Sequence, residues 1–182
     1  MHSFILNIAL FFILIASSST LCNGLTRKVS GETDPIVLTC RKVTDFGFCV
    51  ITLRSDPRSA KASVYGLAQI ALGKLGNHAK DTSSYTRELQ KGCPVQMKRA
   101  VGVCVHYYSI ATLKDVPAAV KFLNAKAYGV AKKAASAAMM DEAQCQAVIN
   151  KNPSPIWQML NSRNEYMHDL SQLSSDLIGL IR

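Results

Sequence analysis

Residues 127–147 read AYGVAKKAASAAMMDEAQCQA, and this alanine-rich run is the strongest helix former in the chain. Alanine loses no side-chain entropy when it enters a helix, so the run predicts a helix that carries Cys145. Asn150 to Pro155 is the predicted loop after it. Helical periodicity continues on both sides of the run. This periodicity predicts an all-α fold.

The segment from Trp157 to Arg182 predicts a final helix with one apolar stripe. Its opposite face is rich in Ser, Asp and Gln rather than Lys, which favours core packing over membrane-surface binding. Trp157 is the predicted packing anchor. The stripe comprises Leu160, Met167, Leu170, Leu173, Leu177 and either Leu180 or Ile181.

Two more helical segments precede the alanine-rich run. The first is predicted to start at Ser55-Asp56-Pro57 and to end at Gly92-Cys93-Pro94. In the second, Pro117 predicts a kink or break at Val116. Apolar residues at helical spacing are Val64, Leu67, Ala68, Ala71 and Leu75 in the first segment, and Ala100, Val101, Cys104, Tyr108 and Ala111 in the second.

A short helical hairpin is predicted over residues 36–53, because the eight residues between Cys40 and Cys49 suit two short helices folded back on each other. No strand-like alternation of useful length occurs. The chain is therefore predicted to be all-α, an up-and-down four-helix bundle preceded by a short N-terminal helical hairpin.

The first residues predict an export signal. Phe4 to Ala16 is apolar apart from Asn7, and small polar residues follow it. This stretch is too short for a membrane-spanning helix, which needs roughly 20 apolar residues. We expect residues 1–24 to be a signal peptide cleaved after Gly24, and residues 25–182 to be one secreted domain that no longer associates with a membrane.

Five cysteines remain after that cleavage, and an exported protein should oxidise most of them. They allow two bridges and one leftover thiol in 15 arrangements, and spacing alone does not select one. No zinc-binding spacing occurs, so no metal site is predicted. The cysteines are Cys40, Cys49, Cys93, Cys104 and Cys145, and the histidines outside the signal are His78, His106 and His168.

The sequence gives no sign of catalysis or of a cofactor. Nucleophile elbow, phosphate-loop, dinucleotide and zinc-protease motifs are all missing from it. Asp141 and Glu142 are adjacent and point in two directions on a helix, which argues against paired catalytic carboxylates. The net charge of +9 favours anionic partners such as acidic proteins or pectin. Nucleic acid is not expected, because aromatic and basic residues do not alternate.

The order of several motifs resembles the plant invertase and pectin methylesterase inhibitor family. These are Cys40-x8-Cys49 before Ser-Asp-Pro, Cys104-x3-Tyr108-x2-Ala111, and Ser136-Ala137-Ala138 before Cys145. The resemblance implies that Cys40 pairs with Cys49, and that Cys104 pairs with Cys145 to tie the second and third bundle helices. Cys93 then has no partner.

The resemblance also implies a function. A secreted inhibitor of plant acid invertase is expected, which docks on the active-site cleft, in the apoplast and cell wall or in the vacuole. Val116-Pro117-x-Ala119-x3-Leu123 is similar to the invertase-directed branch. The alternatives are a pectin methylesterase inhibitor, and a non-inhibitory secreted binding protein.

The target-binding residues implied by the family lie near the middle of the Cys104 to Cys145 segment. Tyr128-Gly129-Val130 stands where invertase inhibitors can present Pro-Lys-Phe. We expect Pro117 and the Asn124 to Gly129 stretch to expose a turn there. The predicted contacts with the enzyme are Lys126, Tyr128, Gly129 and Val130.

Overall fold

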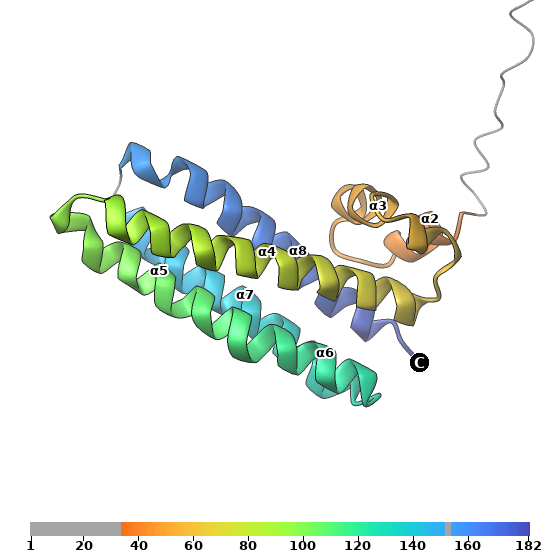
Figure 1. The fold of residues 1–182 in the computed structure, drawn as a ribbon. Coiled ribbons are helices and arrows are strands. Elements are labelled where there is room, and N and C mark those ends of the chain that lie inside the picture. The colour runs from red at the N-terminus through yellow and green to blue at the C-terminus, as the bar shows by residue number, and fades with distance from the viewer. Residues whose placement is uncertain (1–33, 152–153) are drawn as a thin grey trace, which may run out of the picture. The chain divides into compact units, whose positions relative to one another are not determined.

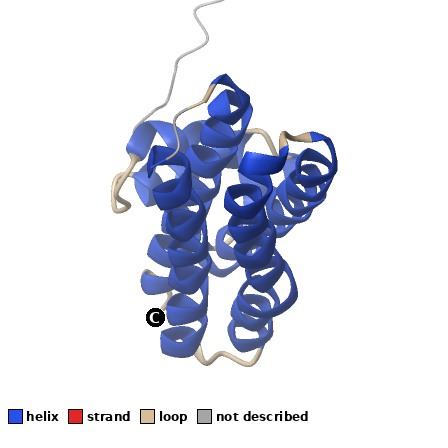
Figure 2. Cartoon of the chain, turned by 90° about the vertical axis from the view of Figure 1, so that its left-hand side faces the viewer, coloured by secondary structure: helices blue, strands red, loops and turns tan. Residues whose placement is uncertain are grey.

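A computed structural model describes residues 34–151 and 154–182 of the chain. The predicted signal peptide and its cleavage site after Gly24 lie outside these residues. The described part is helical and contains no strand, which confirms the predicted all-α class. Four helical columns lie side by side in the bundle (Figures 1 and 2). They are α4 (Val64–Gly92), α5 with α6 (Lys98–Ile110 and Val116–Asn124), α7 (Tyr128–Lys151) and α8 (Gln158–Gly179).

The predicted hairpin consists of α2 (Pro35–Cys40) and α3 (Phe46–Arg54). Each helix begins at an aspartate cap, since Ile36 N donates to Asp34 over 2.9 Å and Phe48 N donates to Asp45 over 2.8 Å. A Cys40–Cys49 disulfide joins the two helices, with their Cα atoms 5.6 Å apart. The loop between them contacts the bundle, because Thr44 N donates to Asp176 of α8 over 2.8 Å.

The long first bundle helix begins later than the sequence predicts. Asp56 accepts from Arg58 N and starts only a 3₁₀ turn, η1 (Pro57–Lys61). Ala62 is then extended, and a second cap, Ser63, accepts from Gly66 N at the start of α4. Two cap residues, Asp56 and Ser63, thus occur within one short segment, and α4 begins directly after the second of them.

The second column is distorted directly before Val116, where a kink or break is predicted, but it is not broken. The helix neither breaks nor stops at Val116, but widens over one π turn, η3 (Ala111–Asp115), and continues as α6. Val116 N donates to Ala111 O, five residues back. The wider turn makes room for the proline ring, which in a regular α-helix clashes with the carbonyl four residues earlier.

The core follows the predicted apolar stripes. On α8, Leu160, Met167, Leu170, Leu173 and Leu177 are all buried, as is the anchor Trp157 in η4 (Pro155–Trp157). Helix α7 faces the interior with alanines 131, 135 and 138, each fully buried. Because these side chains are small, α7 can approach its neighbours closely. Helix α7 continues to Lys151, so it covers the first residues of the predicted loop.

Candidate docking site

The α6–α7 turn consists of Ala125, Lys126 and Ala127, between Asn124 at the end of α6 and Tyr128 at the start of α7. Lys126 N donates to Leu123 O and Ala127 N donates to Phe122 O, both over 2.9 Å. This is the Schellman pattern of a helix end, in which one residue adopts a left-handed conformation. Lys126 occupies that position with φ of 58°, although glycine is the residue that adopts it without strain.

The turn is fixed to the rest of the bundle on both sides. Asn124 Oδ1 accepts from Tyr65 Oη of α4 over 3.1 Å and from Gln69 Nε2 over 3.3 Å. The Ala127 carbonyl accepts from Val130 N and Ala131 N, each over 3.0 Å, at the start of α7. The backbone around Lys126 is therefore held in one conformation before any partner binds.

Of the four predicted contact residues, three are exposed and one is partly buried. Lys126, Gly129 and Val130 are exposed, and 46% of Val130 is accessible to solvent. Tyr128 is the first residue of α7 rather than part of the turn, and its ring is half-buried against the core. Lys126, Gly129 and Val130 thus belong to the exposed surface at this end of the bundle, and Tyr128 is only partly exposed.

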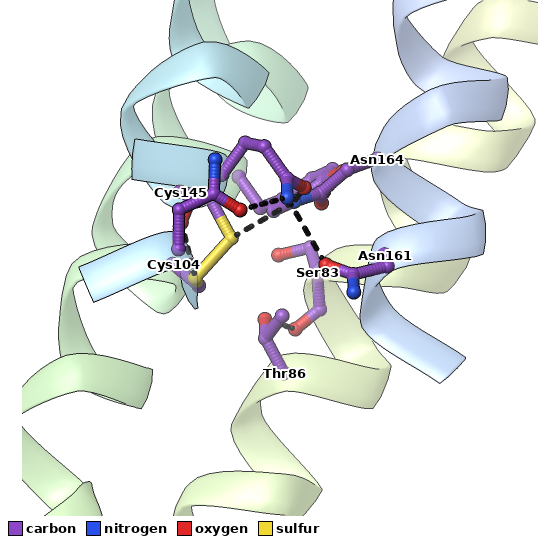
Figure 3. Close-up of a disulfide and its surroundings, with 9 residues drawn as sticks. Ser83, Thr86, Cys104, Cys145, Asn161 and Asn164 are labelled. Atoms are coloured by element: carbon purple, nitrogen blue, oxygen red, sulfur yellow. Dashed lines mark hydrogen bonds between the residues drawn. A yellow bond between two sulfur atoms is a disulfide. The ribbon is translucent and has the colours of Figure 1, made fainter. Parts of the chain in front are cut away.

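A disulfide and a chain of hydrogen-bonded side chains join three helices of the bundle (Figure 3). Cys104 of α5 and Cys145 of α7 are bonded, with Cα atoms 4.5 Å apart. Next to them, Tyr108 Oη donates to Asn164 Oδ1 over 2.8 Å, and Asn164 Nδ2 donates to Gln146 Oε1 over 2.7 Å. These contacts connect α5, α7 and α8. Burial raises the pKa of the Tyr108 hydroxyl far above its usual range, so it stays a neutral donor.

Two buried carboxyl groups lie between η3 and α7. Asp115 and Asp141 are each 8% exposed, and Asp141 Oδ2 has no hydrogen-bond partner among the described residues. Burial, and then the neighbouring Asp115 carboxyl group, raise the pKa of Asp141 from its ordinary 3.8 to about 7. The Lys114 ammonium lies 3.8 Å from Asp115 but is mostly in solvent, so it offsets only part of the repulsion.

The next residue on α7 has a different partner. Glu142 is buried, and its carboxylate lies 3.4 Å from His168 Nδ1 of α8. Burial raises the pKa of Glu142, while His168 opposes that rise. The two adjacent acids point in two directions, as the sequence predicts: Asp141 lies toward Asp115 of η3, and Glu142 lies toward His168 of α8. In residues 34–151 and 154–182 no cluster of three His, Cys, Asp or Glu side chains forms a candidate metal site.

Charged residues are unevenly distributed along the chain, although the motifs of the sequence did not predict this. Residues 98–133 contain seven basic side chains and one acidic side chain, the buried Asp115. The signal was present in the sequence as a long interval without exposed acids. These basic residues lie on α5, η3, α6, the α6–α7 turn and the start of α7, and are Lys98, Arg99, Lys114, Lys121, Lys126, Lys132 and Lys133.

Comparison with known sequences gives a consistent set of relatives. The family described as "Plant invertase/pectin methylesterase inhibitor" matches residues 34–179. The Arabidopsis thaliana "Cell wall / vacuolar inhibitor of fructosidase 1" is 36% identical over 86 residues, 47% of this chain and 42% of that protein. The Arabidopsis thaliana "Cell wall / vacuolar inhibitor of fructosidase 2" is 35% identical over 77 residues, 42% of this chain and 43% of that protein. The alignments thus span less than half the length of these relatives.

Solved structures show the same fold. A crystal structure of a mutant form of a pectin methylesterase inhibitor from Arabidopsis superimposes with a TM-score of 0.69 at 19% identity, covering 79% of this chain and 94% of that one. A second crystal structure, of a pectin methylesterase inhibitor from Arabidopsis thaliana, gives a TM-score of 0.63 at 18% identity, covering 83% of this chain and 98% of that one. Within the described residues no helix is long and apolar enough to cross a bilayer.

Proposed function

Because this chain belongs to the plant invertase/pectin methylesterase inhibitor family, we propose that it is a secreted protein that inhibits an acid invertase by docking on the active-site cleft of the enzyme. The observation that carries this choice of target is the name of the two Arabidopsis relatives, both inhibitors of fructosidase. The protein acts by binding and not by catalysis, in keeping with the inhibitors of its family.

The docking element in this proposal is the α6–α7 turn with the first turn of α7. Lys126, Gly129 and Val130 provide an exposed cation, a bare backbone and an apolar side chain on one small protrusion. The Schellman hydrogen bonds and the contacts of Asn124 hold this protrusion in place, which reduces the ordering cost of docking. A lysine held at positive φ is a local strain that functional sites tolerate more often than structural turns do.

The proposed location is the apoplast and cell wall, with the vacuole as the alternative. Two disulfides support an oxidising compartment, since such bonds are rare in the cytosol. The mature protein in this proposal is residues 25–182. Its partner is a carbohydrate-active enzyme, with no nucleic acid and no membrane involved.

Pectin methylesterase is the second candidate target. The family description covers both kinds of inhibitor, and the segment Tyr128-Gly129-Val130 replaces the Pro-Lys-Phe that invertase inhibitors can present. Titration of the oxidised mature protein into acid invertase and, separately, into pectin methylesterase at mildly acidic pH tests the choice. Loss of invertase activity alone supports the first proposal, whereas loss of esterase activity alone replaces it with the second.

A charge-reversal pair tests the docking element. Lys126→Glu should weaken inhibition at least tenfold without lowering the melting temperature, because Lys126 is exposed. The matched control is Lys98→Glu, which changes an exposed lysine at the first position of α5 and should leave inhibition as in the parent. The start of α5 lies at the end of the bundle opposite the end of α6 (Figure 1). If both variants weaken inhibition equally, only general charge attraction is at work and the turn is not the docking element.

The variant Tyr128→Ala tests whether the Tyr128 ring contacts the enzyme or packs in the core of this protein. If the ring contacts the enzyme, affinity falls by about 2 kcal/mol, roughly 30-fold, with little change in melting temperature. If the ring belongs to the core, the melting temperature falls by several degrees and affinity is unchanged. The second result would restrict the proposed contacts to Lys126, Gly129 and Val130.

A further inference from the structure

A groove runs along the outside of the bundle between α4 and the η3–α6 segment, with a volume of about 410 Å³. Two glycines of α4 form its floor. A Cβ atom at Gly73 would meet nothing within 4 Å, and one at Gly76 would touch Val116 Cγ1 at 3.5 Å. The space is therefore open because side chains are absent from α4. The apolar part of its walls consists of Leu72, Val116, Pro117 and Val120, and the polar part consists of Asn77, Lys80, Thr112 and Lys121.

The groove is elongated and cationic. Its lining residues on α4 extend from Leu72 to Lys80, which at about 1.5 Å per residue is roughly 12 Å. Lys80 lies near one end and Lys121 near the other, and none of the ten described residues that line the groove is acidic. The surrounding segment carries the excess of basic residues described above, which raises the local concentration of anions.

These properties specify a ligand. Small-molecule sites are commonly 300–1,000 Å³, mostly apolar, with a few polar groups that orient the ligand. An apolar wall without aromatic side chains suits a flexible alkyl chain, and the length matches a chain of medium size. A lysine lies at each end of the groove, so a ligand with one carboxylate can pair with an ammonium group whichever way round its chain lies.

We propose that this groove binds a medium-chain fatty acid carboxylate, with the alkyl chain over Gly73 and Gly76 and the acid group at Lys121 or Lys80. This site is distinct from the docking turn and goes beyond the proposed inhibition. No bond is made or broken, so binding is reversible and is governed by burial of the chain and by the two ammonium groups.

The test is calorimetric titration of the oxidised mature protein with decanoate at pH 6.5, below the micelle concentration. We expect saturable binding with one equivalent per chain. Decyltrimethylammonium, which has the same chain length and the opposite charge, should bind at least tenfold more weakly. Equal binding of both amphiphiles, or no saturation by decanoate, would overturn the proposal.

Variants locate the site. Gly73→Leu fills the floor and should weaken decanoate binding at least tenfold, whereas Gly92→Leu, at an open glycine near the end of the same helix, should not change it. Lys80→Gln with Lys121→Gln should also weaken it at least tenfold, against an unaffected Lys91→Gln with Lys98→Gln control. If Gly73→Leu does not fold, Val120→Ser on the exposed wall replaces it and should weaken binding in the same direction.

Other occupants would give different results. If a second copy of the chain covers the groove, sedimentation will show a dimer that Gly73→Leu dissociates, and this would overturn the fatty acid assignment. Decanoate affinity that is unchanged in all groove variants would overturn it as well. Because no enzyme is present in these experiments, their outcome is independent of whether the protein inhibits invertase.

Discussion

Replacing Asp141 by Asn should make the protein more stable near neutral pH. In the folded chain the pKa of Asp141 is raised from 3.8 to about 7, mainly by burial and then by Asp115. Between these two values the native state retains a proton that the unfolded chain has released. The free energy of unfolding therefore falls as the pH rises through this window, and the loss is complete above about pH 7.

The size of the effect follows from the same numbers. Each pH unit in the window removes up to about 1.4 kcal/mol, and the window from 3.8 to about 7 is about three units wide, which sets an upper limit near 4 kcal/mol. Small movements that admit water should reduce the observed loss to about 2–3 kcal/mol. Asparagine has nearly the same shape and no charge, so Asp141→Asn should avoid this loss at pH 7.5 and gain little at pH 4.5.

Urea unfolding of both proteins from pH 4.5 to pH 8 measures the difference. At each pH the free energy of unfolding of the parent is subtracted from that of the variant, which removes most of the contribution of other titrating groups. The raised pKa values of Glu142 and Asp169 lower the stability as the pH rises, in the same direction as Asp141. The pKa of His78 is lowered by burial and acts in the opposite direction. Glu88→Gln, in an exposed pair with Lys91, is the matched control and should follow the parent at every pH. A difference that stays constant with pH, or a variant less stable at pH 7.5, would refute the reasoning.

Three further changes have definite expected outcomes. Lys126→Gly should raise the free energy of unfolding by about 1 kcal/mol, since glycine adopts the positive φ without strain, and should weaken inhibition if the lysine docks; an unchanged melting temperature would contradict the strain. Tyr108→Phe leaves Asn164 Oδ1 buried without its donor and should cost about 1–3 kcal/mol in urea unfolding, more than Tyr107→Phe at a half-buried position. Replacing Cys104 and Cys145 by serine opens a loop with a sequence separation of 41 and should cost about 4 kcal/mol, and a loss below about 1 kcal/mol would exclude a stabilising role.

Periodicity predicted the fold well because the apolar stripes of α4, α5 and α8 are long and regular. The same reasoning placed the serines of α8 on a solvated face, and there it was wrong. Ser171, Ser174 and Ser175 are buried. Ser174 Oγ donates to Leu170 O over 2.7 Å, so a small hydroxyl group satisfied by its own helix can be buried like an alanine.

The candidate site was predictable only in part. The break between α6 and α7 was visible in the sequence, but the left-handed Lys126 was not, because a Schellman turn normally shows a glycine. Asp115 is the last residue of the π turn before Pro117, and no local sequence pattern predicts which residues of α7 will lie against such a turn. The pairing of the cysteines was likewise beyond what spacing alone could determine.

The Cys104–Cys145 bond also makes residues 104–145 a covalent ring, and the exposed α6–α7 turn is part of it. A protease that cut the chain once at Lys126 would open this ring without dividing the molecule, since α5 and α7 would stay joined by their sulfurs. Such a nicked protein would run as one species until it is reduced, and both sides of the cut would remain close together. A protein built in this way can lose a peptide bond in an exposed turn and still remain one molecule.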